Sequence, residues 1–438
     1  MIILTHHTGE PHGILGAQVA ATFLERKLSI PSIVVGIERH FSKHNLIDFL
    51  NEHYAGKEKM VAFSHLCGRK DLFDLMRNLG QEGFVTLLGG PQVRQDYTGE
   101  PEADSYPHRF RGLKSICDLA FHGPVDGLRP EHLGLRGSMI ERPWTRDIYL
   151  EVNWSNLYTF SGSLKKLDVR LGQVLNAVGC PYAKHTQAVT LPPPTSLREK
   201  GVPEMEVQSE GCIFCDVAKD KGYHGTLAFD KVMAQIAGLP GSDGRKIPFE
   251  LIDEYPIRSL GRLLLETESH GTHLSQINLV CRVDDINTHA SELGDLLSLA
   301  QKLDVRIMFA SIGFESFSDP LLQFFCKGIT VEDMVKCVAT LRSLKNRFKN
   351  HLLYRRDEGA THGFIRPTPW DDSDMLREID TTVFIHGFQE DILPEHSTPL
   401  IIHHASTLGN WIRQIELTTE MTFSRDGTWI EWWNPSLK

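Results

Sequence analysis

The sequence lacks the features of an exported or membrane-spanning chain. Its first residues run directly into a polar, glycine-bearing loop, without the basic region, long apolar stretch and small-residue cleavage site of a secretory signal. No apolar run reaches the roughly 18 residues that a membrane-spanning helix needs. Eight cysteines scattered over 438 residues do not resemble a disulfide framework. We therefore expect a cytoplasmic protein with reduced thiols and no membrane partner.

Clusters of lysine and arginine are also absent, and the formal net charge is -10. A nucleic-acid-binding surface needs such clusters to neutralise phosphates, so we expect no nucleic acid as a partner. Internal repeats, low-complexity tracts and coiled-coil heptads do not stand out either. The 41% of hydrophobic residues is ample for the cores of the two or three domains that this length favours.

Up to about residue 130, short apolar segments alternate with amphipathic segments of helical length. This pattern indicates a parallel sheet covered by helices, and predicts an α/β, Rossmann-like (flavodoxin-like) domain over residues 1–130. Ligands of such sheets lie beyond the carboxyl ends of the strands. We expect strands at 2–4, 33–37, 60–64, 85–88 and 119–121, and helices at 15–28, 46–53 and 71–81. The loops that should share one rim are 5–13, 64–70, 89–92 and 122–127.

Residues 131–177 are expected to bridge to a second domain, with a helix over 164–178. Renewed alternation then predicts a partial (β/α)6, TIM-like barrel over 178–370, which residues 371–438 close while shaping a substrate pocket. The expected strands are 205–208, 249–252, 277–280, 306–311 and 363–365. The expected helices are 227–236, 259–267, 291–303, 320–325 and 331–344.

Three cysteines in the middle of the chain carry the strongest chemical signal. Cys180 lies in the phrase VGCPY (178–182), and Cys212 and Cys215 lie in SEGCIFC (209–215). Two thiolates spaced Cys-x-x-Cys can reach one metal centre from a single tight turn. The 31 residues between Cys180 and Cys212 are rich in proline and should be extended chain or loop. We interpret the phrases as one cysteine loop split by an insertion.

Other sites would explain parts of this pattern. A zinc site uses the same Cys-x-x-Cys spacing, and His185 or His224 would then be the fourth ligand. A redox dithiol also uses it, although no thioredoxin-like pattern surrounds these cysteines. The first domain alone is compatible with a nucleotide-binding scaffold or with no ligand. It has neither a Gly-x-Gly-x-x-Gly phrase after its first strand nor a P-loop.

Residues 178–370 resemble the radical S-adenosylmethionine (SAM) superfamily. The resemblance rests on the cysteine loop and on IGFES (312–316), DPLL (319–322) and KGITVED (327–333). It implies that Cys180, Cys212 and Cys215 hold a [4Fe-4S] cluster whose open iron binds SAM. The reduced cluster of such enzymes cleaves SAM to methionine and a 5′-deoxyadenosyl radical.

The superfamily's usual cysteine spacing is Cys-x-x-x-Cys-x-x-Cys. Here Gln208 stands at the first of these positions, so Cys180 must take its place. The remaining cysteines of the barrel, Cys281, Cys326 and Cys337, lie in apolar patterns and are expected in the core.

The family pattern also implies the SAM contacts. Asp253 and Glu254 would hold the methionyl ammonium, Arg282 would pair with the carboxylate, and Glu315 would be a further polar contact. The alternative for each residue is a solvated charge at a strand end.

Residues 1–130 resemble the cobalamin-binding domain of one large class of radical SAM enzymes. The matching phrases are PHGILG (11–16), VAFS (61–64), LLGGP (87–91) and the bend at Gly123. The Asp-x-His-x-x-Gly motif that gives cobalt a histidine is absent, as it often is in this class. The resemblance implies cobalamin contacts from Pro11, Gly13, Ser64, His65, Arg69, Gly89, Gly90 and Gly123. His65 and Arg69 can equally be ordinary polar residues of a loop.

These resemblances imply a cobalamin-dependent radical SAM enzyme, with a methyltransferase acting on an unactivated carbon of a small molecule or peptide as the favoured activity. Its partners would be that substrate and an electron donor such as flavodoxin or ferredoxin. One alternative uses cobalamin for a rearrangement, ring contraction or cyclisation, or dispenses with it. Another is a non-catalytic corrinoid or zinc carrier.

Overall fold

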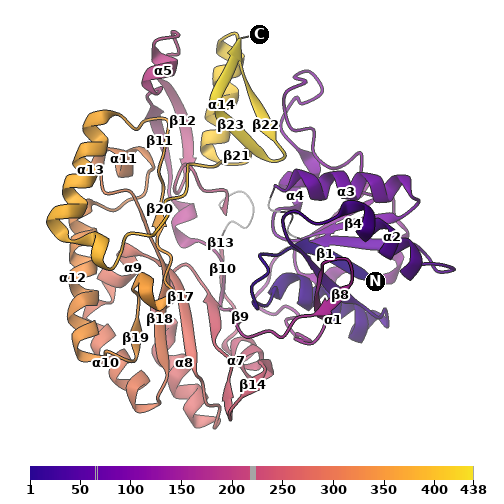
Figure 1. The fold of residues 1–438 in the computed structure, drawn as a ribbon, viewed down its shortest axis with the longest axis horizontal. Helices are drawn as coiled ribbons and strands as arrows, with labels where there is room; N and C mark the ends of the chain where they lie inside the picture. The colour runs from indigo at the N-terminus through magenta and orange to yellow at the C-terminus, as the bar shows by residue number, and fades with distance from the viewer. Residues whose placement is uncertain (65, 67, 218–222, 438) are drawn as a thin grey trace. The chain divides into compact units, whose positions relative to one another are not determined.

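The computed structural model describes residues 1–64, 66, 68–217 and 223–437. The chain divides into two compact units. The first comprises Met1–Gln173, Lys219–Pro240 and Ser424–Ile430, and the second comprises Val174–Ala218, Gly241–Phe423 and Glu431–Lys438 (Figure 1). Among the described residues, no helix is both long and apolar enough to cross a membrane.

The first unit is built on an 8-stranded sheet with the order β6-β5-β4-β3-β1-β2-β7-β8. Every neighbouring pair is parallel except β7 with β8. The strands are β1 (Ile2–His6), β2 (Ile33–Ile37), β3 (Met60–Ser64), β4 (Val85–Gly89), β5 (Leu119–His122), β6 (Ser138–Glu141), β7 (Leu157–Phe160) and β8 (Leu164–Lys166). The parallel α/β domain predicted from the sequence is confirmed.

Both faces of this sheet are buried, because side chains alternate along each strand. Leu4 of β1 and Phe63 of β3 belong to a core shared with α2, α3 and α4, whereas Met60 belongs to a core on the opposite face. Burying one such side chain contributes about 1.5–3 kcal/mol. Figure 1 shows α2 and α3 on one side of β1 and β4, and α1 on the other. The helices are α1 (Leu15–Leu28), α2 (Lys43–His53), α3 (Lys70–Gln81), α4 (Val93–Thr98) and α7 (Phe229–Gly238), with 3-10 turns η1 (Val125–Gly127) and η2 (Pro130–Gly134) and strand β13 (Tyr223–Thr226).

The second unit is built on a 6-stranded sheet, here called the barrel sheet, with the order β19-β18-β17-β16-β9 and with β20 also paired to β18. Strands β16 to β20 pair in parallel. The strands are β9 (Gly172–Leu175), β16 (Phe249–Ile252), β17 (Gln276–Arg282), β18 (Arg306–Glu315), β19 (Leu352–Leu353) and β20 (Gly363–Phe364). The β–α alternation predicted for this region is confirmed.

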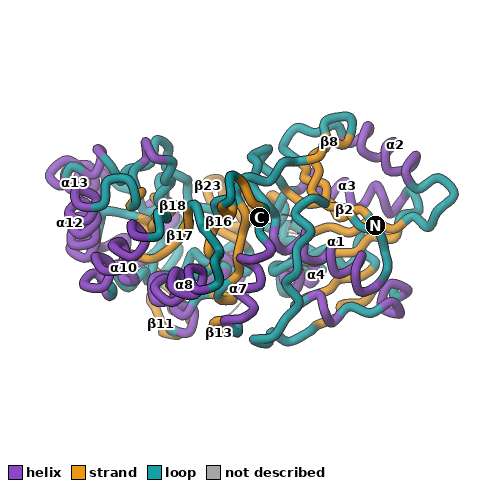
Figure 2. Tube along the Cα trace, turned by 90° about the horizontal axis from the view of Figure 1, so that it is seen from below, coloured by secondary structure: helices purple, strands orange, loops and turns teal. Residues whose placement is uncertain are grey.

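Helices cover the outer face of the barrel sheet. Figure 2 shows α8, α10 and α12 in purple outside the orange strands β16, β17 and β18. Helix α12 starts at a capping box in which Thr330 and Asp333 bond reciprocally, as the phrase KGITVED allows. The helices are α8 (Ile257–Ser269), α9 (Val283–Thr288), α10 (Ala290–Lys302), α11 (Asp319–Phe324) and α12 (Val331–Arg347), with η4 (Arg356–Glu358) and the short strands β14 (Gly241–Ser242) and β15 (Arg245–Lys246).

The insertion between the cysteine phrases forms an antiparallel hairpin of β11 and β12. The C-terminal segment adds two helices and a 3-stranded sheet of order β21-β23-β22, and α14 packs against β12. These elements are β10 (Ala177–Gly179), η3 (Pro181–Lys184), β11 (Thr186–Leu191), α5 (Thr195–Arg198), β12 (Met205–Glu210), α13 (Ser373–His386), η5 (Phe388–Glu390), β21 (Ile402–His403), α14 (Thr407–Thr418), β22 (Met421–Asp426) and β23 (Trp429–Leu437).

Two sequence predictions about these elements are wrong. The helix predicted over 164–178 is instead three strands, β8, β9 and β10. Its leucines recur at helical spacing, but β8 pairs with β7 and β9 pairs with β16, so sheet pairing outweighs the local preference. The segment 205–208, predicted as a barrel strand, lies in the hairpin, and β9 occupies the edge of the barrel sheet beside β16.

Candidate active site

Cys180 directly follows β10, the short strand that comes after β9, the edge strand of the barrel sheet. The N–H of Asn176 donates to the carbonyl of Ile252 at 3.0 Å, so the chain leading to Cys180 runs beside the end of β16. The Cys180 carbonyl then accepts the N–H of Ala183 at 3.1 Å as the chain turns into η3. Cys180 therefore lies where loops of this kind of sheet carry catalytic groups.

The hairpin of β11 and β12 closes at its base, where Thr186 pairs with Glu210. Beside this base, the N–H of Gly211 donates to the carbonyl of His185 at 2.8 Å. Gly211 has φ +69, and a Cβ there would lie 3.1 Å from the backbone of Ala183, so the close approach favours glycine. The segment that precedes Cys212 thus lies against the segment that follows Cys180.

Cys212 and Cys215 lie in one tight turn. The N–H of Cys215 donates to the carbonyl of Cys212 at 3.1 Å, and the N–H of Ile213 donates to the carbonyl of Phe325 at 3.1 Å. The cysteines of the described residues are free thiols, so this pair is not a disulfide. The turn presents two sulfur atoms beside the Cys180 loop, as the split-loop interpretation expects.

Burial and a nearby carboxylate raise the pKa of the Cys180 and Cys215 thiols. Burial raises the pKa of Cys180 to about 11, and the charge of Glu254 adds to this shift. Burial also raises the pKa of Cys215, with smaller contributions from Asp216, Cys212 and Glu254. Glu254 therefore acts on both halves of the split loop, and a bound metal would have to displace the thiol protons.

A zinc site would need a fourth ligand beside the three cysteines. Of the histidines proposed as zinc ligands, His185 is exposed with its ring 4.9 Å from that of Tyr182. His224 belongs to the first unit, with its ring 6.2 Å from that of Trp144.

Arg282 ends β17 and is only 5% exposed. Its Nε donates to Asp284 at 2.8 Å, its Nη2 donates to the carbonyl of Lys327 at 2.6 Å, and its Nη1 lies 3.6 Å from the sulfur of Cys212. The guanidinium also stacks on the ring of Tyr182, 4.0 Å from the centroid. The structure thus places this predicted residue at the cysteine loop, with all three nitrogens in use.

The two acids at the end of β16 have different surroundings. Asp253 is buried, and its carboxylate accepts from Asn176 at 2.6 Å and from the N–H of Tyr255 at 2.9 Å. It also lies 3.6 Å from the guanidinium of Arg258. Asp253 therefore supports the strand end, whereas Glu254 interacts electrostatically with the thiols.

Glu315 ends β18 and forms a buried ion pair with Lys327, with a distance of 2.8 Å. Glycines make room for the pair: a Cβ on Gly313 would lie 2.7 Å from the Lys327 nitrogen, and one on Gly363 would lie 3.1 Å from a Glu315 oxygen. Glu315 and Cys326 both have positive φ, 65 and 53, which few residues other than glycine adopt. Such strained backbone gathers at functional sites.

In the first unit, the register places Thr5, Ser64, Gly89 and Phe121 in a row along the carboxyl edge of the sheet. The nearest atom to a Cβ on Gly89 would be the carbonyl oxygen of Phe63, at 3.9 Å. The space beside Gly89 is therefore open, which fits the close approach expected of a large flat cofactor.

Two of the predicted glycines instead make room for the chain itself. A Cβ on Gly13 would lie 2.3 Å from the ring of Trp154. Gly123 has φ +110, and a Cβ there would lie 2.0 Å from the carbonyl oxygen of Arg142. Both glycines are needed for packing whether or not a cofactor binds.

The remaining rim residues lie beside these positions. Gly90 follows β4 with φ +119. Pro11 accepts the N–H of Leu171 at 3.2 Å through its carbonyl. The predicted contact His65 lies outside the described residues.

Arg69 is 7% exposed and holds three rim loops together. Its guanidinium donates to the carbonyls of Ile37 and Glu38, both at 3.0 Å, and to Asp71 at 2.9 Å, and it lies 2.9 Å from Nδ1 of His6. His6 and Ile37 are the last residues of β1 and β2, and Asp71 lies in the first turn of α3. The guanidinium of Arg69 thus connects the ends of β1 and β2 to the start of α3.

No family model and no curated protein sequence matches this chain. Solved structures of the cobalamin-dependent SAM radical enzyme OxsB do match it, over 98% of its length. The structure of OxsB with aqua-cobalamin and SAM bound gives a TM-score of 0.53 at 13% identity, and the apo, selenomethionine-labelled structure gives 0.54 at 12%. The structure with aqua-cobalamin bound gives 0.52 at 14%.

The chain has the fold of a cobalamin-dependent radical SAM enzyme. It spans 63% of the length of the OxsB chain in the first of these structures. The fold predicted from the two resemblances is confirmed. The roles of individual residues stay predictions.

Sequence reasoning missed three residues that contact the predicted site residues. Lys327 is the first residue of KGITVED, and Tyr182 lies in VGCPY. Both phrases carried the resemblance to the superfamily, so these two residues could have been singled out from the sequence. Asn176, which donates to Asp253, carries no comparable signal because its role depends on how β9 lies beside β16.

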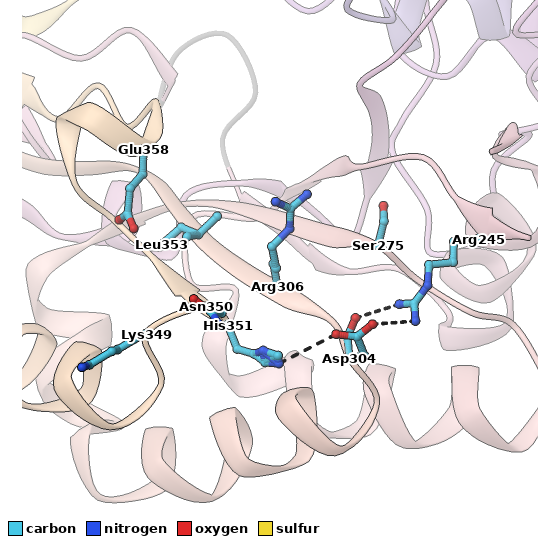
Figure 3. A pocket seen from close by; sticks show the side chains of 9 residues that line it. All are labelled: Arg245, Ser275, Asp304, Arg306, Lys349, Asn350, His351, Leu353 and Glu358. Carbon is cyan, nitrogen blue, oxygen red and sulfur yellow. Dashed lines mark hydrogen bonds and ion pairs between the residues drawn. The ribbon is translucent and has the colours of Figure 1, made fainter. Parts of the chain in front are cut away.

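A pocket of about 620 Å³ lies at the opposite, amino-terminal end of the barrel strands (Figure 3). Arg245, Asp304 and His351 interact across it, with Arg245 donating to Asp304 at 2.8 Å and His351 lying 3.9 Å from the same carboxylate. None of the predicted site residues that the structure describes lines this pocket. In this fold the chemistry belongs to the carboxyl ends of the strands, so we do not assign the active site here.

Proposed function

We propose that the protein is a cobalamin-dependent radical SAM enzyme, and that it methylates an unactivated carbon of a small molecule or peptide. The observation that carries this proposal is the closed hairpin of β11 and β12, which brings the Cys180 loop against the Cys212–Cys215 turn. The OxsB-like fold supports the same conclusion, because it combines this site with a parallel sheet that has an open glycine at its rim.

Cys180, Cys212 and Cys215 would hold a [4Fe-4S] cluster, and Gly89 and its neighbours along the rim would hold cobalamin. When bound, the cluster supplies the electron that cleaves SAM, and cobalamin supplies the methyl group.

The chain's own residues position the SAM. Glu254 would bind the methionyl ammonium, because its charge acts on both Cys180 and Cys215. Glu315 is held by Lys327 and fixes the end of β18.

Anaerobic reconstitution with iron and sulfide tests the cysteine assignment. Cys212→Ala and Cys180→Ala should each lose the visible absorption of the cluster and the formation of 5′-deoxyadenosine. Cys326→Ala is the matched control, because this buried thiol also interacts with Cys212 but lies beside Ser209 of β12. It should keep both signals. A cluster that survives Cys180→Ala but not Cys326→Ala would show that the third ligand is wrong, and stoichiometric zinc without iron would favour the carrier hypothesis.

Cobalamin binding is tested separately by its absorption bands. Gly89→Val fills the open space beside β4 and should weaken cobalamin binding at least tenfold while the cluster signal is unchanged. Gly80→Ala, at the end of α3 with no atom within 4 Å of the added Cβ, is the control.

Turnover with a candidate substrate and a flavodoxin or ferredoxin as electron donor addresses the reaction. A product that gains one methyl group supports the methyltransferase. Formation of 5′-deoxyadenosine with an unmethylated, rearranged product would assign cobalamin another role.

A further inference from the structure

Arg282 contacts both halves of the split cysteine loop. Its guanidinium stacks on Tyr182, two residues after Cys180, and its Nη1 points at the sulfur of Cys212 at 3.6 Å. An N–H···S contact at this distance lies within the range for sulfur acceptors. A contiguous Cys-x-x-x-Cys-x-x-Cys loop would hold its cysteines together through its own backbone. In this chain a side chain from β17 provides a connection between the two halves.

The contacts of Arg282 hold it in one orientation. Asp284 and the carbonyl of Lys327 accept from Nε and Nη2, the two nitrogens of one edge of the guanidinium, and Nη1 faces Cys212. A substrate carboxylate could form two parallel hydrogen bonds only by displacing one of these partners. Pairing of Arg282 with the methionyl carboxylate would therefore cost an existing hydrogen bond, whereas donation to Cys212 uses the contacts as they stand.

Tyr182 is fixed as firmly as Arg282. Its hydroxyl donates to the carbonyl of Cys326 at 2.9 Å, and a Cβ on Gly328 would lie 2.3 Å from that hydroxyl. The stacked pair thus connects η3, the end of β17 and the turn after α11. Movement of either cysteine phrase relative to the other would break several of these contacts.

Among the charged groups described around Cys212, Arg282 is the cation that points at the sulfur and is not fully neutralised by a buried carboxylate. Lys327 is neutralised by Glu315 at 2.8 Å, in a pair whose side chains are 5% and 13% exposed. Asp284 pairs with Arg282 but is 34% exposed, so water screens it more than the 6% exposed arginine. Glu254 acts in the opposite sense, from the side of Cys180 and Cys215.

We propose that Arg282 is a positioning residue that braces the split cysteine loop and raises the reduction potential of the cluster by donating an N–H to the Cys212 sulfur. This inference rests on the proposed function, in which Cys212 is a cluster ligand. Reduction adds one negative charge to the cluster, and a buried cation with an N–H···S bond stabilises that charge. Arg282 therefore favours the reduced state that SAM cleavage needs.

The test is an EPR-monitored redox titration of reconstituted protein without substrate. Arg282→Met should lose its cluster to an iron chelator faster than the wild type, because the loop is no longer braced. In its loaded fraction, the ratio of reduced to oxidised cluster at a fixed poise should fall about tenfold, or about 59 mV for one electron. Arg282→Lys keeps the charge and should recover part of the shift. Arg245→Met removes an arginine that also bonds a carboxylate and backbone carbonyls, at the opposite end of the same strands, and should leave the potential unchanged.

A fully loaded Arg282→Met protein with the wild-type potential overturns the proposal. A folded Arg282→Met protein that no longer assembles the cluster supports the bracing role. If Arg282→Met does not fold, Arg282→Gln takes its place, and an unchanged potential in that variant also overturns the proposal. Failure of the proposed function gives a different result, because the wild type itself would then take up no cluster.

Discussion

Both ends of the barrel sheet carry ion pairs between a basic side chain and a carboxylate, but the pairs differ in how deeply they are buried. At the carboxyl ends, Arg282 is 6% exposed and the Lys327–Glu315 pair is buried. At the amino ends, Arg245 also bonds a carboxylate and backbone carbonyls, but it is 35% exposed and its partner Asp304 is 72% exposed (Figure 3). Charges lose their screening when water is excluded, so the same ion pair acts far more strongly at the end where the cysteines lie.

The largest expected effect comes from breaking the buried pair at the carboxyl end. Lys327→Met leaves the Glu315 carboxylate buried without its cation, and should lower the free energy of unfolding by about 3–5 kcal/mol. Urea denaturation of the metal-free protein measures this. The double variant Lys327→Met/Glu315→Gln should regain much of the loss. Equal losses in the single and double variants would mean that the two side chains are not coupled.

A second acidic side chain at the carboxyl end, Asp285, should make the folded protein more stable when its charge is removed. Asp285 of α9 is 1% exposed, and burial raises its pKa to about 6 against the opposing effects of the Ile257 N–H and His289. A raised acid pKa means that the folded state binds the proton more tightly, so stability falls as pH rises from about 4 to 6. Asp285→Asn should therefore be more stable than the wild type at pH 8, by at most about 3 kcal/mol.

The advantage of Asp285→Asn should disappear below about pH 4, where both states of the wild type are protonated. Unfolding free energies measured from pH 3.5 to 8 check this. A difference that does not vary with pH would show that Asp285 is not the titrating group.

At the amino end the pH dependence should have the opposite sign. Burial alone would raise the pKa of Glu358, but bonds from Lys345 and from the N–H groups of Arg355 and Tyr354 hold it below its usual range. Its contribution is present at neutral pH and is lost as pH falls below about 4.5. Glu358→Gln should cost about 1–2 kcal/mol at pH 7 and nothing once the wild-type carboxyl is protonated. Equal stability of the two proteins at pH 7 would contradict this.

The smallest expected effect is that of Arg245→Met. An ion pair this exposed contributes about 0–1 kcal/mol, and added salt should reduce the difference further. Thermal unfolding at two salt concentrations measures it. A loss as large as that of Lys327→Met would remove the contrast between the two ends.

The sequence predicts the alternating elements well, because strands such as Ile33–Ile37 and helices such as Leu15–Leu28 carry their periodicity and end signals locally. It fails over 164–178, where leucines at helical spacing form strands that pair with neighbours outside the segment. The local sequence pattern of a segment does not show whether a sheet edge elsewhere in the fold will pair with it.

The candidate site divides in the same way. The cysteines were visible as residue types, but their proximity depends on the Thr186–Glu210 pairing and the hydrogen bond from Gly211 to His185. The partners of Arg282 and Asp253 come from several separate segments of the chain. Their charge and their position at strand ends identify such residues as candidate site residues. Only the tertiary structure shows which hydrogen-bond partners they already have.

The hairpin that closes at its own base makes the distance between the cysteines independent of the number of residues that separate them. Residues can be gained or lost at the far tip, near α5, without moving the ends that flank Cys180 and Cys212, and each doubling of such a loop costs only about 0.6 kcal/mol. Pattern searches that require neighbouring cysteines would pass over chains built this way. Radical enzymes with interrupted motifs should therefore be sought by the pairing of the inserted strands.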